Sequence, residues 1–90
     1  MSNPAITYIT KNKWNKVATN VTKGTIHRIS ETPSMYLQSY RETGGAAPTS
    51  FTEAVPMFSK YPNEEEISAT SAIDVYVSCR RRNGIVRVDI

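Results

Sequence analysis

Residues 73–90 read IDVYVSCRRRNGIVRVDI, and this C-terminal stretch decides the fold. Apolar and polar side chains alternate on both sides of Asn83-Gly84, which is the period of a β-strand. Asn-Gly accepts the positive φ angles of a type I′ turn and is the strongest short signal for a β-hairpin. With a two-residue turn, Cys79 would face Val88, so both apolar rows would lie on one face. The stretch therefore predicts a closing antiparallel hairpin with one buried side.

The composition of the whole chain also favours strands. Val, Ile and Thr supply 25 of the 90 residues, and Leu37 is the only leucine. β-branched side chains suit a pleated, half-buried surface, and a helical core without leucine would be unusual. Pro33, the loop TGGAAPTS at 43–50 and Pro56 separate further short strands. We predict an all-β fold: a single small antiparallel β-sandwich or flattened barrel, jelly-roll or Ig-like.

The length and the residue counts exclude several kinds of site. A chain of 90 residues points to one domain with one modest core. The single cysteine, Cys79, excludes an internal disulfide framework, and the single histidine, His27, excludes a multi-histidine metal centre. We therefore expect no enzyme activity and no cofactor, with Cys79 buried and His27 partly exposed on a strand. No apolar run approaches the ~18–20 residues of a membrane span, and no secretory signal is visible, so we expect neither membrane insertion nor secretion.

Charge is distributed unevenly along the chain. Residues 1–30 sum to +5, residues 31–79 to −5 and residues 80–90 to +3. This asymmetry suggests that like chains, or the chain and a partner, meet through opposite patches. The alternative is that these charged residues simply lie on solvent-exposed faces of strands and bind no partner.

The first 23 residues form a distinct basic segment, which carries four lysines, no acidic residue and the only tryptophan. We expect an adhesive arm or an edge strand at 1–23, followed by the sandwich domain at 24–90. Aromatic residues contribute strongly to interfaces, although Trp14 would equally suit the core of an edge strand. The predicted partner-binding residues of this segment are Tyr8, Lys11, Lys13, Trp14, Lys16 and Lys23.

The arginines near the C-terminus form a second candidate site. It comprises Arg80, Arg81, Arg82 and Arg87. Arg80 and Arg87 would lie opposite each other on the outer face of the predicted hairpin, and a phosphate or an acidic surface would relieve their repulsion. With Tyr36, Tyr40 or Tyr76 on a neighbouring face, the site would be a platform for single-stranded nucleic acid. A protein partner and a solvated turn remain as alternatives.

The layout of the chain resembles small phage virion accessory proteins, which often form one β-sandwich of this length. The resemblance rests on GTIHRISETPSMYLQSYRE at 24–42, AVPMF at 54–58 and EEEISATSAIDVYVSCRRRNGIVRVDI at 64–90. It implies a structural virion protein: a capsid decoration or cement protein, or a head-fibre or tail-associated protein. Its partners would then be other virion proteins, met by protein–protein adhesion, and it would form a homo-oligomer such as a trimer. A small nucleic-acid-binding β-domain is the alternative.

Overall fold

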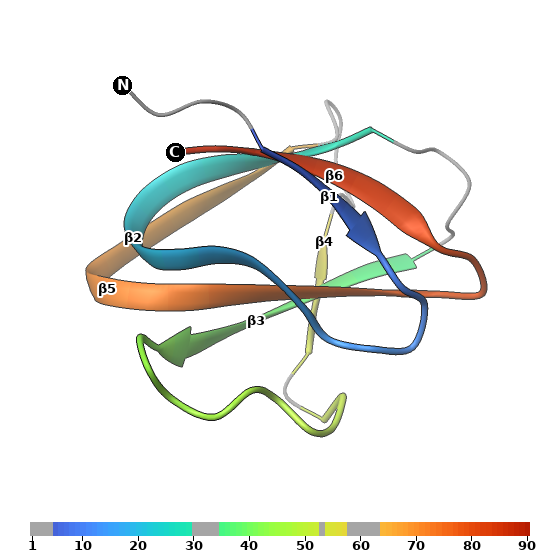
Figure 1. Cartoon of the computed structure of the whole chain (residues 1–90), viewed down its shortest axis with the longest axis horizontal. Helices are drawn as coiled ribbons and strands as arrows, with labels where there is room; N and C mark the ends of the chain where they lie inside the picture. The colour runs from blue at the N-terminus through green and yellow to red at the C-terminus, as the bar shows by residue number, and fades with distance from the viewer. Residues whose placement is uncertain (1–4, 30–34, 53, 58–63) are drawn as a thin grey trace.

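The computed structural model describes residues 5–29, 35–52, 54–57 and 64–90. Every regular element within these ranges is a β-strand, so the all-β prediction is confirmed (Figure 1). None of the described residues forms a helix long and apolar enough to cross a membrane. The strands are β1 (Ala5–Ile9), β2 (Asn15–Arg28), β3 (Met35–Glu42), β4 (Val55–Met57), β5 (Glu64–Arg80) and β6 (Gly84–Asp89).

The strands form one antiparallel sheet in the order β1-β6-β2-β5-β3-β4. The two long strands, β2 and β5, pair along most of their length, but their register shifts at three places between Lys16 and Lys23. Such irregularities bend a strand and increase its twist. Figure 1 shows β2 and β5 turning back together at the left of the molecule. The shared bend folds a single sheet over itself into two layers, which gives a flattened, barrel-like sandwich.

The core lies between the two layers. β1, β6, the end of β2 and the start of β5 form one layer, and the start of β2, the end of β5, β3 and β4 form the other. The predicted burial of Val75, Val77 and Cys79 on β5 and of Val86 and Val88 on β6 is confirmed. Ile90, however, is 51% exposed, and β5 has more than one buried side, because Asp74, Tyr76 and Ser78 are buried too. The buried cluster contains Ile9, Ala18, Val21, Ile26, Tyr36, Ile67, Val75, Val77, Cys79, Val86 and Val88.

The predicted Asn-Gly hairpin is wrong, because β5 and β6 are not neighbours in the sheet. β6 lies between β1 and β2, where Val86 is opposite Thr7 and Val88 is opposite Ile26. Residues 81–83 instead carry the chain from one layer to the other, and Arg81 has a φ of 76° there. The period of two correctly predicted the core residues Val75, Val77, Cys79, Val86 and Val88, but it carries no information about which strand lies alongside.

The predicted separate arm is also wrong. β1 is an edge strand paired with β6, as the edge-strand alternative expected, but the first half of β2 pairs with β5. The proposed boundary after residue 23 falls inside β2, and Ile9, Ala18 and Val21 are buried in the core. The described part of this segment therefore belongs to the sandwich, and its removal would open the core.

Gly84 is required for packing rather than for a hairpin turn. A Cβ atom at this position would overlap the hydroxyl of Tyr36 and lie 2.8 and 2.9 Å from two of its ring carbons. The Tyr36 hydroxyl also accepts a hydrogen bond from the backbone N–H of Ile85 at 3.3 Å. Gly84 thus lets the fully buried Tyr36 ring approach the start of β6.

Replacing Gly84 with alanine should destabilise the protein by about 1–3 kcal/mol, the usual cost of overpacking a core. Chemical denaturation of the two proteins measures this difference. In a Tyr36→Leu background the same substitution should cost much less, because the obstructing ring is gone. An equal cost in both backgrounds would contradict the proposed contact.

Candidate functional site: a basic tip

The loop after β1 and the corner between β5 and β6 lie side by side at one end of the molecule. The backbone N–H of Asn12 donates to the carbonyl of Cys79 at 2.8 Å. The N–H of Lys11 donates to Oδ1 of Asn83 at 3.0 Å. Figure 1 shows the two segments together at the right. The fold thereby joins residues 10–14 to residues 80–83, and Lys11 and Asn83 are 72 positions apart in the sequence.

The side chain of Asn15 holds the 10–14 loop in shape. Its amide nitrogen contacts three carbonyls, those of Lys13 at 2.9 Å and of Thr10 and Val77 at 3.3 Å. The first two close the loop on itself, and the third attaches it to β5. The loop is therefore fixed to the sheet by its own sequence, and its lysines are presented from a defined backbone.

Five cationic side chains gather at this end, and we name them the basic tip: Lys11, Lys13, Arg80, Arg81 and Arg82. All five are exposed. Within the described part of the chain, none of them forms an ion pair with an acidic residue. Arg81 adopts a positive φ, a conformation that glycine accepts more easily than arginine. Members of the two groups of cations that the sequence suggested as separate sites thus form one surface with a concentrated positive potential.

Trp14 makes contacts inside the molecule through both its ring and its indole N–H. Its ring stacks on Phe51 with the centroids 5.2 Å apart and the planes at 27°. Its indole N–H donates to the carbonyl of Ser50 at 3.0 Å, and the guanidinium of Arg80 lies 4.9 Å from the Phe51 ring centroid. The stack fixes Ser50 and Phe51 against the tip and places Arg80 over the Phe51 ring. These internal contacts agree with the alternative that Trp14 packs as a core residue of an edge strand, and its role as a partner anchor stays a prediction.

Lys16 is occupied by a structural ion pair. Its ammonium lies 3.4 Å from the buried carboxylate of Asp74 and 5.7 Å from the centroid of the Tyr76 ring. The hydrogen bond and the charge of Asp74 raise the pKa of Lys16 above its ordinary value. Lys16 therefore serves the fold and is not part of the basic tip.

Asp74 in turn ties three segments together. Its carboxylate accepts hydrogen bonds from the backbone N–H of Asn20 at 3.0 Å and of Gly44 at 3.4 Å, and it pairs with Lys16. The Asn20 N–H is the main cause that lowers the pKa of Asp74 below its ordinary 3.8, although burial opposes it. Asn20 has a φ of 57° at one of the register shifts of β2. Asp74 therefore stabilises the bend of the sheet.

The remaining predicted cations lie away from the tip. Lys23 is opposite Ser68, beyond the last register shift of β2. The guanidinium of Arg87 contacts both carboxylate oxygens of Asp89 at 3.3 Å. Arg80 and Arg87 are on strands that do not pair, so the predicted repulsion between them does not occur.

The tyrosines required for a nucleic-acid platform are largely unavailable. Tyr36 and Tyr76 are only 1% and 5% exposed. Tyr40 is partly exposed, and its hydroxyl contacts Oε1 of Gln38 at 3.4 Å. Tyr8, by contrast, is 75% exposed and lies opposite Ile85, a few residues from the corner at 81–83. Tyr8 is the exposed aromatic residue at the border of the basic tip.

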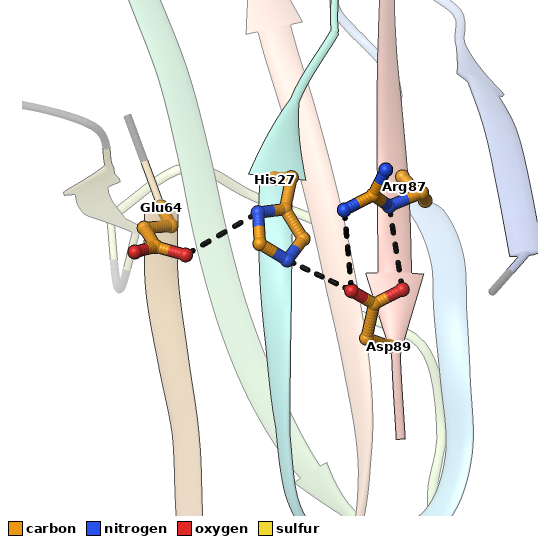
Figure 2. Close-up of polar contacts among 4 residues, drawn as sticks. All are labelled: His27, Glu64, Arg87 and Asp89. Carbon is orange, nitrogen blue, oxygen red and sulfur yellow. Dashed lines mark hydrogen bonds and ion pairs between the residues drawn. The ribbon is translucent and has the colours of Figure 1, made fainter. Parts of the chain in front are cut away.

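A second polar cluster surrounds His27 on the outer face of the other layer (Figure 2). Nδ1 of His27 lies 3.3 Å from the carboxylate of Glu64, and Nε2 lies 2.9 Å from that of Asp89. Arg87 clamps Asp89 from the other side. The histidine side chain is 26% exposed, which confirms the expected partly exposed position. The cluster links β5, β2 and β6, whose residues are distant in the sequence, so no local motif could have indicated it.

Next to this cluster is a surface hollow of about 320 Å³, lined by Thr25, Glu64, Glu65 and Glu66. We name it the acidic hollow. It lies at the first residues of β5, whereas the basic tip begins at the last residue of the same strand. The described residues contain no cluster of three His, Cys, Asp or Glu side chains able to hold a metal ion.

Cys79 is buried, as predicted from its place on the inner face. Its thiol donates to the carbonyl of Arg82 at 3.0 Å and so helps to shape the corner. Burial raises the pKa of the thiol, which keeps it in the unreactive protonated form. Cys79 therefore stabilises the backbone beneath the basic tip and is not itself a reactive site.

Comparisons with known proteins leave the site to be interpreted from its own chemistry. No protein-family model, characterised protein or solved structure gives a significant match to the chain. The charge and exposure of the basic tip are therefore the basis for a functional assignment.

The lowered pKa of Asp74 predicts a specific loss of stability in acid. The folded state favours the ionised carboxylate, so its contribution is complete above the ordinary pKa of 3.8 and disappears as the pH falls through the lower folded value. Asp74→Asn should be less stable at neutral pH and should lose less stability on acidification than the unmodified protein. Urea unfolding at a series of pH values measures both effects. An unchanged acid dependence in the variant would contradict this role.

Trp14→Ala should destabilise the protein by roughly 1–3 kcal/mol, because a half-buried aromatic stack and a hydrogen bond are lost. Thermal unfolding followed by circular dichroism gives the difference. Trp14→Phe should recover most of the loss, since it can still stack on Phe51. A free surface role for Trp14 would instead leave the stability of both variants unchanged.

Proposed function

We propose that this protein is a structural, non-catalytic component of a virus particle that adheres to an acidic protein surface through its basic tip. The main support for this proposal is that five exposed cations from two distant segments lie together and have no acidic partner within the described part of the chain. Concentrated like charge on a small domain opposes folding, and a complementary surface relieves it. The role in the particle would be that of a capsid decoration or cement protein, or of a head-fibre or tail-associated protein.

The make-up of the tip supports adhesion to a protein. Arginine and exposed aromatic residues are enriched at protein interfaces, and here three arginines are exposed and Tyr8 lies opposite Ile85, three residues after Arg82. The backbone beneath them is fixed by hydrogen bonds from Lys11, Asn12 and Asn15. A preorganised surface loses less conformational entropy on binding than a flexible arm would.

The assignment to a virus particle is supported by the resemblance of layout to small phage virion accessory proteins. The segments that carry it, 24–42, 54–58 and 64–90, include the long bent strand β5 and the corner of the basic tip. Proteins of this kind act by adhesion and require no catalytic centre. The surface chemistry and the resemblance therefore favour the same class of function.

Binding of single-stranded nucleic acid is the second candidate, because the same cations would attract phosphates. Such binding normally adds stacking of bases on open aromatic faces. Near the tip, Trp14 and Phe51 stack on each other, and Arg80 lies over Phe51. Tyr8 is left as one open ring at the border of the tip, whereas such binding stacks successive bases on several rings, so an acidic protein surface is the better partner for the tip.

The proposal predicts that neutralising the tip removes the protein from particles without unfolding it. Virus particles purified on a density gradient from cells that make the protein should contain it at a fixed copy number. The double variant Lys11→Gln/Arg82→Gln should retain its circular dichroism spectrum and be depleted from the particles at least about tenfold, as expected when close interfacial charge pairs are lost.

Lys23→Gln is the matched control, because it removes an exposed cation outside the tip and should be incorporated normally. Incorporation of the double variant at the full level, or absence of the unmodified protein from particles, would contradict the proposal. Tight binding of the purified protein to oligothymidylate, abolished by the same double variant, would favour the nucleic-acid alternative.

A further inference from the structure

The two edges of the sheet differ in how they are protected against pairing with another chain. β4, at one edge, has only three residues, and Pro56 at its centre has no N–H to donate. β1, at the other edge, has the sequence AITYI, without a charge or a proline. Shortness, charge and proline are common features that stop an edge strand from pairing with another chain. Of the two edges, β1 is therefore the one suited to receive a further strand.

Only one side of β1 is paired within the described part of the chain. The strand pairs with β6 along its whole length. Its last residue, Ile9, also contacts β5, since its carbonyl oxygen lies 3.7 Å from the sulfur of Cys79. This contact fixes the end of β1 to the rest of the molecule. The unpaired side of the strand thus runs along Ile6, Thr7 and Tyr8.

The outer face of this edge is apolar. The exposed fractions of Ile6 and Tyr8 are 57% and 75%. Both side chains point away from the core, because successive residues of a strand alternate between faces and Ile9 is buried. Arg87 is the charged residue opposite β1, and its guanidinium contacts the carboxylate of Asp89. The edge therefore presents two large apolar side chains beside an ion pair that is already formed.

β1 is complementary to a second copy of itself. In an antiparallel pair centred on Thr7, Ile6 of each copy lies opposite Tyr8 of the other copy, and the two Thr7 residues lie opposite each other. Aromatic–β-branched pairs and Thr–Thr pairs are favourable cross-strand combinations. Twofold symmetry forms the Ile6–Tyr8 pair twice, so that both exposed side chains of each strand gain a partner.

The basic tip favours the antiparallel direction. β1 runs towards the tip, because Lys11 follows shortly after Ile9, the last residue of the strand. In a parallel pair the two tips would lie side by side and repel each other. In the antiparallel pair the two Lys11 residues are about eight residues apart along the strands, or roughly 27 Å at ~3.4 Å per residue. This distance exceeds the screening length of ~8 Å at physiological salt, so the tips do not oppose the contact.

We propose that β1 of one copy pairs antiparallel with β1 of a second copy, so that the protein forms a symmetric dimer with one sheet layer continuous across the twofold axis. A second copy fits this edge because a twofold contact uses the same self-complementary residues on both sides. The inference goes beyond the function proposed for the basic tip, whose five cations stay outside the contact. A dimer would present two tips, and two tips engage a surface with repeated sites more tightly than one.

Sedimentation equilibrium of the purified chain tests the inference. We expect a reversible dimer whose population rises with protein concentration and persists in about 1 M sodium chloride, because apolar and backbone contacts are not screened by salt. Ile6→Glu/Tyr8→Glu places like charges opposite each other twice and should raise the dissociation constant about tenfold or more. Val55→Glu is the matched control, because it adds a charge at an exposed apolar residue of the other edge strand and should dimerise normally.

A second variant tests the register of the pair. In Ile6→Glu/Tyr8→Lys, the new carboxylate of each copy lies opposite the new ammonium of the other copy, so dimerisation should recover. A parallel pair, or an antiparallel pair centred on Ile6 or Tyr8, would instead bring like charges together. Both double variants should keep the circular dichroism spectrum of the unmodified protein, because the two side chains are exposed on the outer face.

A chain that stays monomeric up to about 1 mM would overturn the inference and would leave the edge of β1 to an extended segment of another protein. Equal dimerisation of Ile6→Glu/Tyr8→Glu and the unmodified chain would overturn it as well, as would a failure of Ile6→Glu/Tyr8→Lys to recover the dimer.

The tip variant separates this inference from the proposed function. Lys11→Gln/Arg82→Gln should dimerise normally, because the tip lies outside the contact, and loss of its dimer would contradict the inference. Normal incorporation of a dimeric Lys11→Gln/Arg82→Gln into particles would refute the proposed function and leave the dimer standing. Depletion of the same variant from particles, together with a monomeric unmodified chain, would support the function and refute the dimer.

Discussion

The coincident bend of β2 and β5 is the constraint on which the rest of the structure depends. The two strands pair along most of their length, so neither can turn without the other. Three register shifts between Lys16 and Lys23 let both strands turn at the same place, and the single sheet becomes two facing layers. Without this bend the apolar rows of β5 and β6 would face water and the chain would have no enclosed core.

The buried carboxylate of Asp74 shows how polar groups maintain that bend. It accepts the backbone N–H of Asn20, which adopts a left-handed conformation at a register shift, and the N–H of Gly44 in the following loop. Lys16 supplies the compensating charge. Lys16, a lysine of the basic N-terminal segment, therefore has a structural role. It differs in this from Lys11 and Lys13 of the same segment, which are available to a partner.

The same bend determines where the surface charges lie. It leaves the two ends of β5 on different parts of the molecule, with glutamates at the start and arginines at the end. The loop after β1 adds Lys11 and Lys13 to the arginine end through two backbone hydrogen bonds. A small domain with several exposed cations at one end is suited to adhesion, which agrees with the proposed role in a particle.

The sequence by itself determined the all-β class and the inward-facing residues of the last two strands, because the two-residue period of a strand is a local property. It identified both groups of cations as well, and the buried positions of Val77, Cys79 and Val88. It could not determine which strands are neighbours, since pairing depends on long-range contacts, so the Asn83-Gly84 hairpin and the separate arm were wrong. Only the tertiary structure placed Lys11 beside Asn83 and His27 between Glu64 and Asp89, because those contacts join segments that local patterning does not connect.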